Sequence, residues 1–83
     1  MNRLYITNAT DAGNLSVRLT FNDNTSQVVN VGEFIRQYPH PQYNKYLDER
    51  KFRQFKIEDG NIVWGKNWDL IFPIEQLYRG HIE

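Results

Sequence analysis

The segment around Asp59-Gly60 constrains the fold more than any other part of this sequence. Asp-Gly is a favoured two-residue turn of a β-hairpin, because both central positions need a positive φ. Pairing outward from this turn places Ile57 opposite Ile62, and Phe55 opposite Trp64. All four apolar side chains then share one face, so turn chemistry and hydrophobic pattern agree on one register. We therefore expect an antiparallel hairpin that extends from Phe55 to Trp64.

Residues 15–21 predict a strand of an earlier hairpin. Apolar and polar residues alternate along it, which is typical of a half-buried antiparallel strand. The apolar positions are Leu15, Val17, Leu19 and Phe21. The polar run at 22–25 supplies a turn, and residues 27–31 supply the returning strand.

The register of this earlier hairpin stays open in the sequence. A two-residue loop places Val28 opposite Leu19, whereas a three-residue loop places Val29 there. A slip of one residue would turn every side chain to the other face. The alternating residues 4–8 predict a short N-terminal edge strand, and residues 11–14 predict the turn that follows it.

The first helix is predicted from its two ends. Asn30 and Glu33 resemble a capping box, in which Asn30 is the N-cap and Glu33 reaches back to it. Pro39 ends the helix, because the residue before a proline avoids helical backbone. Residues 39–41, Pro-His-Pro, are expected to form an extended loop.

Two further helices are predicted downstream. Asp48 is suited to cap a short helix that extends to Phe52. Pro73 suits the first position of a closing helix, and Gly80 suits the residue just beyond its end.

Together these elements predict one α+β domain over residues 1–83. The expected architecture is a small antiparallel sheet of about five short strands, made of two hairpins and the N-terminal strand. Two or three short helices pack on that sheet.

The composition excludes several functions. Cysteine is absent, which excludes disulfides and thiolate metal sites, and two distant histidines are too few for a zinc site. Ten basic and ten acidic residues cancel, which argues against a general nucleic-acid binder. We predict no cofactor. No stretch has the pattern of a signal peptide or a membrane span, which predicts a cytoplasmic protein.

Asp69 is the carboxylate that most suggests chemistry. It stands between Trp68 and Leu70, and an apolar pocket there would raise its pKa. The favoured alternative is that Asp69 accepts hydrogen bonds from backbone amides near the last helix, since buried charges need partners. Neither a nucleophile elbow nor a glycine-rich phosphate loop is present, so we expect no enzymatic activity.

Five residues are candidates for an interaction surface. They are Tyr38, Tyr43, Tyr46, Trp68 and Asp69. Tyrosine is enriched in interface hot spots, and twelve aromatic residues are many for a domain of this size. We therefore expect a small protein-interaction or regulatory module whose partner is another protein or a second copy. No membrane and no small-molecule ligand are predicted as partners.

Residues 43–56 offer an alternative function, which is weak binding of nucleic acid. Rings and positive charges interleave there, as they do in single-strand binders, with five basic residues against two acidic ones. Asp48 and Glu49 interrupt the pattern, and the chain as a whole has no positive surplus.

The order of motifs resembles a small, uncharacterised bacterial family, domain of unknown function twenty-four forty-two. The resemblance rests on Phe21 before a polar turn, Leu47-Asp48 with Phe52, Gly60 to Trp64, Trp68-Asp69-Leu70, and Pro73 to Tyr78. It covers about residues 4–79, on this order of strands and helices. It implies an α+β fold with an antiparallel sheet and suggests a regulatory role. It implies no activity and no catalytic residue.

Overall fold

The structure, a computed structural model, describes residues 3–83. Within this range, two three-stranded antiparallel sheets are accompanied by short helices. Sheet A contains β1 (Ile6–Gly13), β2 (Ser16–Phe21) and β3 (Ser26–Asn30), and sheet B contains β4 (Lys56–Glu58), β5 (Asn61–Trp64) and β6 (Leu70–Ile71). The helical elements are α1 (Val31–Gln37), α2 (Pro41–Asn44), the 3-10 turn η1 (Lys45–Leu47), α3 (Glu49–Phe52) and α4 (Ile74–Arg79).

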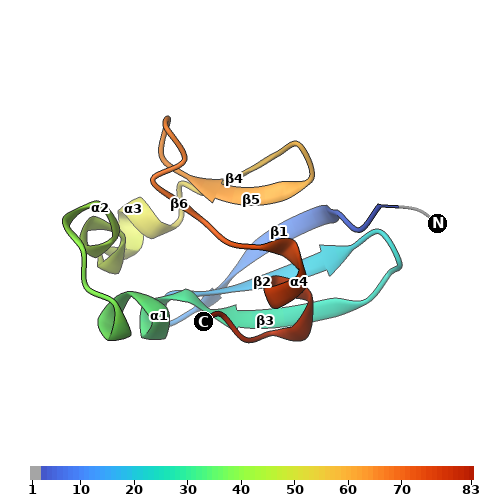
Figure 1. The fold of residues 1–83 in the computed structure, drawn as a ribbon, viewed down its shortest axis with the longest axis horizontal. Helices are drawn as coiled ribbons and strands as arrows, with labels where there is room; N and C mark the ends of the chain where they lie inside the picture. Colours follow the sequence, from blue (N-terminus) through green and yellow to red (C-terminus); the bar gives the residue numbers. More distant parts are fainter. Residues whose placement is uncertain (1–2) are drawn as a thin grey trace.

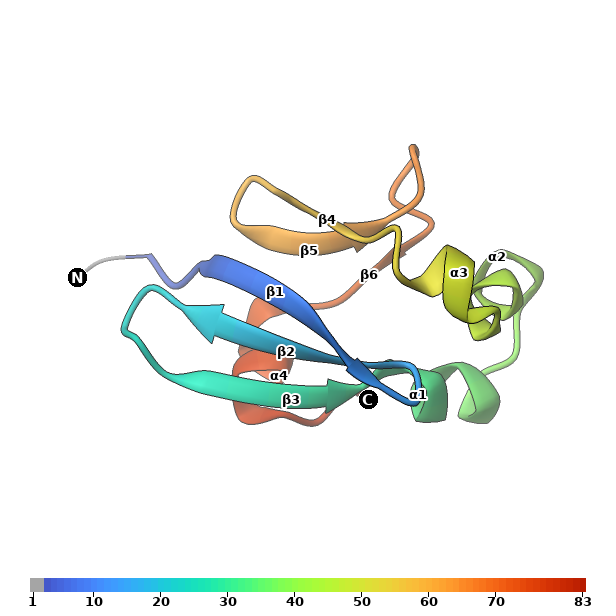
Figure 2. The same ribbon diagram turned by 180° about the vertical axis from the view of Figure 1, so that it is seen from behind.

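The two sheets lie beside each other, and the helices α1 to α3 gather at one end of the long axis (Figure 1). Helix α4 lies on one face of sheet A, as the view from behind also shows (Figure 2). The α+β class is therefore confirmed, but the expected single sheet of about five strands is not. The helical segment from α1 to α3 separates the strands into two sheets, and the two-residue β6 is too short to give a sequence signal.

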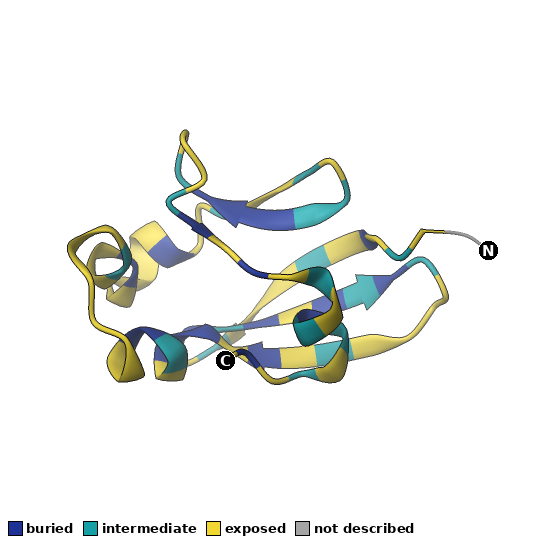
Figure 3. Ribbon diagram, viewed as in Figure 1, coloured by how far each residue is buried: buried dark blue, intermediate teal, exposed yellow. Residues whose placement is uncertain are grey.

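Sheet A buries one face. Val17, Leu19 and Phe21 of β2 are buried as their alternation predicts, together with Ile6 of β1 and Val29 of β3. Figure 3 shows this alternation as bands of buried and exposed backbone along the strands. A row of apolar side chains on one face, opposed by polar ones, is the signature of a half-solvated antiparallel sheet.

Both registers considered for the β2–β3 hairpin are wrong. Leu19 pairs with Gln27, and Val29 pairs with Val17. Both predicted loops begin at Asp23. In the structure the loop begins one residue earlier, at Asn22, since the Phe21 amide donates a hydrogen bond to the Thr25 carbonyl at 2.9 Å. Asn24 supplies the positive φ that this three-residue turn requires.

Strand β1 is longer than expected. It extends over the predicted turn at residues 11–14 and carries two irregularities in its pairing with β2, at Thr7 and Ala12. Bulges of this kind are common on edge strands, where they disrupt pairing with other chains.

The hairpin around Asp59-Gly60 has the predicted register, with Ile57 opposite Ile62. Both turn residues have positive φ, as the turn chemistry requires. Two details differ. The pairing ends at Lys56 and Val63, so Phe55 lies just before β4 and is not paired with Trp64. Ile57 is 38% exposed, because β4 is an edge strand of sheet B. Trp64, on the same face, is fully buried.

The predicted helix caps are largely confirmed. The side chain of Asn30 accepts a hydrogen bond from the Glu33 amide, and that of Asp48 accepts one from the Arg50 amide. The extended loop expected at residues 39–41 is shorter, since His40 is extended but Pro41 is already the first residue of α2. Pro73 is the N-cap of α4 rather than its first helical residue, and Gly80 is its left-handed C-cap as expected.

Candidate functional site

The five candidate interaction residues lie in two separate places. Tyr38 and Tyr43 lie beside Phe34, at the end of the molecule formed by α1 and α2. Tyr46 and Asp69 lie together where η1 meets the loop between β5 and β6. Trp68 belongs to that loop but points to a different surface.

The first place is an aromatic surface made of Phe34, Tyr38 and Tyr43. The ring centroid of Phe34 lies 5.1 Å from that of Tyr38 and 6.0 Å from that of Tyr43. Tyr38 is 49% exposed, whereas the other two rings are half-buried. A hollow of about 370 Å³ beside these rings is lined by the same three residues and Glu83.

The local sequence explains why these rings meet. Phe34 and Tyr38 are four residues apart at the end of α1, so they lie on one helix face. Tyr43 follows in α2, which begins where the His40 side chain accepts a hydrogen bond from the Gln42 amide. The ring of Phe34 packs edge-to-face on Phe72, which is buried in the core. The aromatic surface is therefore fixed to the core through Phe34.

The second place is an anchor between Lys45, Tyr46 and Asp69. Lys45 Nζ lies 2.7 Å from Asp69 Oδ2, and the Tyr46 hydroxyl donates to the same oxygen at 3.3 Å. The Asp69 side chain is only 15% exposed. Gly65 makes room for this contact, because a Cβ there would lie 2.7 Å from Asp69 Oδ2.

The hydrogen bond from Lys45 holds the pKa of Asp69 below its ordinary value, against the opposing effect of burial. The same hydrogen bond raises the pKa of Lys45. The pKa of Tyr46 is raised chiefly because its hydroxyl is partly buried. The idea that apolar neighbours raise the pKa of Asp69 is therefore wrong. The predicted hydrogen bonds from backbone amides near the last helix to Asp69 are also wrong. The carboxylate of Asp69 accepts instead from the side chains of Lys45 and Tyr46 in η1.

Trp68 lies against the outer face of sheet B. Its indole Nε1 donates a hydrogen bond to Glu58 Oε1 at 2.9 Å. Glu58 belongs to β4, whereas Trp68 lies in the loop between β5 and β6. That face also carries Val63, which is fully buried without belonging to the main core. Trp68 is still 47% exposed and has a φ of 54°, which is unusual for an aromatic residue.

Most of the positive charge in residues 43–56 is neutralised within the chain. Lys45 pairs with Asp69, Arg53 with Asp11 and Glu49, and Lys56 with Glu58. Tyr46 is buried, so its ring cannot stack on a base, whereas Tyr43 is half-buried against Phe34 and keeps part of its ring exposed.

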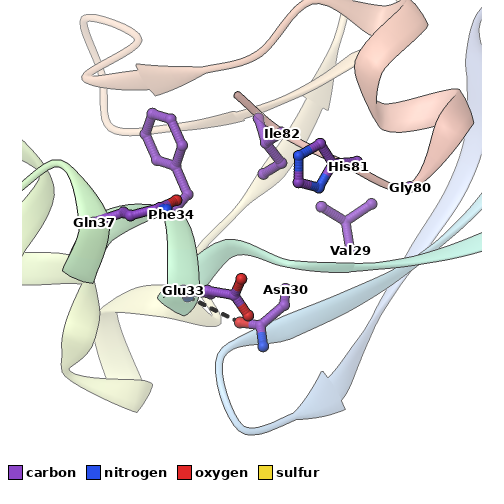
Figure 4. A pocket seen from close by; sticks show the side chains of 8 residues that line it. All are labelled: Val29, Asn30, Glu33, Phe34, Gln37, Gly80, His81 and Ile82. Carbon is purple, nitrogen blue, oxygen red and sulfur yellow. Dashed lines mark hydrogen bonds between the residues drawn. The ribbon is translucent and has the colours of Figure 1, made fainter.

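A small hollow between α1 and the C-terminal residues 80–82 gave no signal in the sequence. Its volume is about 130 Å³, and Figure 4 shows Glu33 and Gln37 of α1 on one side, with His81 and Ile82 on the other. Glu33 and His81 are the titratable groups that line it. Across residues 3–83, no group of three or more His, Asp or Glu side chains is placed to hold a metal ion.

None of the helices in residues 3–83 combines the length and the apolar character that a membrane span requires. Comparisons with protein-family models, with curated proteins and with solved structures each found no match to this chain.

Proposed function

We propose that this chain is a non-enzymatic protein-binding module, and that the aromatic surface of Phe34, Tyr38 and Tyr43 is its contact site. The observation that carries the proposal is the half-exposed ring of Tyr38, supported by Phe34, which is itself packed on core residue Phe72. A ring held in place before binding loses little conformational entropy on association, which is one reason that tyrosines dominate interface hot spots.

The chemistry of the hollow supports one kind of partner. Its walls are aromatic, and Glu83 is the charged residue that lines it. An arginine or lysine that enters it would contact the faces of the tyrosine rings and pair with that carboxylate. We therefore propose a partner protein that presents a basic side chain next to an apolar one.

The alternative, weak nucleic-acid binding through residues 43–56, has less support. Three of the five cations in this segment are held by carboxylates of the same chain, which leaves Arg50 and Lys51 to contact phosphates. Binding through two charges would be weak and strongly dependent on salt. The family resemblance and a cytoplasmic location belong to the proposal as well, and both rest on the sequence alone.

Substitution of Tyr38 tests the proposal. With a purified partner taken from the native host, Tyr38→Ala should raise the Kd about 30-fold, the effect of losing one hot-spot ring. Tyr5→Ala is the matched control, because Tyr5 is 40% exposed and directly precedes β1, whose start lies at the other end of the molecule from α1 and α2 (Figure 1).

Equal affinity of the Tyr38→Ala and Tyr5→Ala variants would contradict the proposal. Sedimentation velocity identifies the kind of partner. A wild-type dimer that Tyr38→Ala converts to a monomer would assign the surface to a second copy of the chain instead.

A further inference from the structure

A third hollow lies between the β1–β2 turn and the helical end of the molecule, and it shares no lining residue with the aromatic surface. We call it the turn groove. Its lining residues are Asn14, Leu15, Asn30, Arg36, Leu47 and Glu49. Its volume is about 440 Å³, which is within the usual range of small-molecule sites.

One wall of the turn groove is rigid. Asn14 and Leu15 have φ values of 52° and 59°, a backbone region that side chains other than glycine rarely adopt. Contacts with α1 hold Leu15 there: its carbonyl accepts hydrogen bonds from the Val31 and Gly32 amides at 3.1 and 3.0 Å. Gly32 permits this close approach, since a Cβ there would lie 2.8 Å from that of Leu15. The wall is therefore formed before any ligand binds.

The turn groove carries two opposite charges that do not pair with each other. Among residues 3–83, the ion pairs join Lys45 to Asp69, Arg53 to Asp11 and Glu49, and Lys56 to Glu58. Arg36 belongs to none of them. Glu49 has only the contact with Arg53, at 3.6 Å between side chains that are both mostly exposed. Arg36 and Glu49 thus line one groove, Arg36 without an ion-pair partner among residues 3–83 and Glu49 with a single exposed contact.

We propose that the turn groove binds the zwitterion of a free α-amino acid. The planar guanidinium of Arg36 binds the carboxylate, for which its geometry is suited. Glu49 accepts hydrogen bonds from the ammonium group, and the exposed side chain of Leu47 contacts an apolar side chain of the ligand. A ligand with both charges satisfies both residues, whereas a simple anion or a simple cation leaves one of them without a partner.

Titration of the uniformly ¹⁵N-labelled full chain with L-leucine tests this proposal. We expect amide chemical shifts to change at Asn14, Arg36 and Glu49, with a Kd of about 1 mM for so small a ligand in an open groove. Leucinamide lacks the carboxylate and N-acetyl-leucine lacks the ammonium group. Each should bind about tenfold more weakly or worse, because each loses one charge-assisted contact.

Two surface variants complete the experiment. Arg36→Gln and Glu49→Gln should each raise the Kd for L-leucine about tenfold, whereas Arg50→Gln, at an exposed position outside the groove, should leave it unchanged. The proposal is overturned if L-leucine shifts none of the groove residues at ~50 mM. It is also overturned if N-acetyl-leucine binds equally well, or if Arg36→Gln binds as the wild type does.

Discussion

At the scale of single residues, the two tryptophans differ in what they do. Trp64 is fully buried, packs against Phe52, Phe55 and Phe72, and donates its indole N–H to the Phe52 carbonyl at 2.8 Å. Trp68 is half-exposed on the outer face of sheet B. The first ring belongs to the core, and the second covers a surface.

Replacement of each tryptophan should therefore have a different cost. Trp64→Ala should lower the free energy of unfolding by about 3–5 kcal/mol, as large aromatic truncations in cores do. Trp68→Ala is the matched control and should cost less, since it removes less buried surface. Urea denaturation measures both values. A similar loss of unfolding free energy in the two variants would contradict the assignment of Trp64 to the core.

Asp69 makes stability depend on pH. Because its pKa is lower in the folded chain than in the unfolded one, its contribution is complete above the ordinary carboxyl pKa of about 4. The contribution is lost as the pH falls below that value toward the lowered folded pKa. Asp23 and Glu58, whose pKa values are also lowered by hydrogen bonds, act in the same direction.

The Asp69→Asn variant should consequently lose less stability than the wild type between pH 5 and about pH 2, the window in which carboxylates protonate. Thermal melting at a series of pH values measures this slope. An identical acid slope in both proteins would mean that Asp69 has no favourable partner in the folded state.

At the scale of elements, the loop between β5 and β6 depends on one glycine. Gly65 has a φ of 86°, and a Cβ there would lie 2.7 Å from Asp69 Oδ2 and 2.8 Å from the Tyr46 hydroxyl. Gly13 has nearly the same φ, 87°, but a Cβ there would meet nothing within 4 Å. An alanine at either position would have the same strained backbone, but only an alanine at position 65 would also clash with neighbouring side chains.

Gly13→Ala should cost about 1–2 kcal/mol, the price of a left-handed alanine. Gly65→Ala should cost clearly more, because the added methyl also displaces the Lys45–Asp69 contact. Chemical denaturation of the two variants gives the comparison directly. If Gly65→Ala is no worse than Gly13→Ala, the loop does not need this close approach.

The elements also differ in how well the sequence predicts them. The hairpin around Asp59-Gly60 is predictable because its turn admits one length, and the apolar pattern agrees with it. The turn after Phe21 is polar over four residues and admits several loop lengths, so its register depends on the fit of Val29 and Gln27 against the rest of the chain. Strand β6 has only two residues, and its pairing with β5 is a tertiary contact.

At the scale of the whole molecule, the aromatic residues divide between core and surface in a way that spacing alone does not reveal. Tyr46 and Tyr43 are three residues apart, yet one is buried beside Asp69 and the other packs on Phe34 at the surface. Tertiary contacts decide this, because the Tyr46 hydroxyl reaches Asp69 in the β5–β6 loop whereas Tyr43 packs on Phe34 of α1. The sequence identifies the candidate residues, but their grouping into two places requires the fold.

We propose that the end of the molecule formed by α1 and α2 binds a protein. Site-specific photo-crosslinking in the native host tests it most directly, with a photoreactive phenylalanine analogue placed at position 38 and, as the control, at position 5. We expect a covalent adduct with one defined protein from position 38 and none with that protein from position 5. Absence of an adduct at position 38, or the same adducts from both positions, would contradict it.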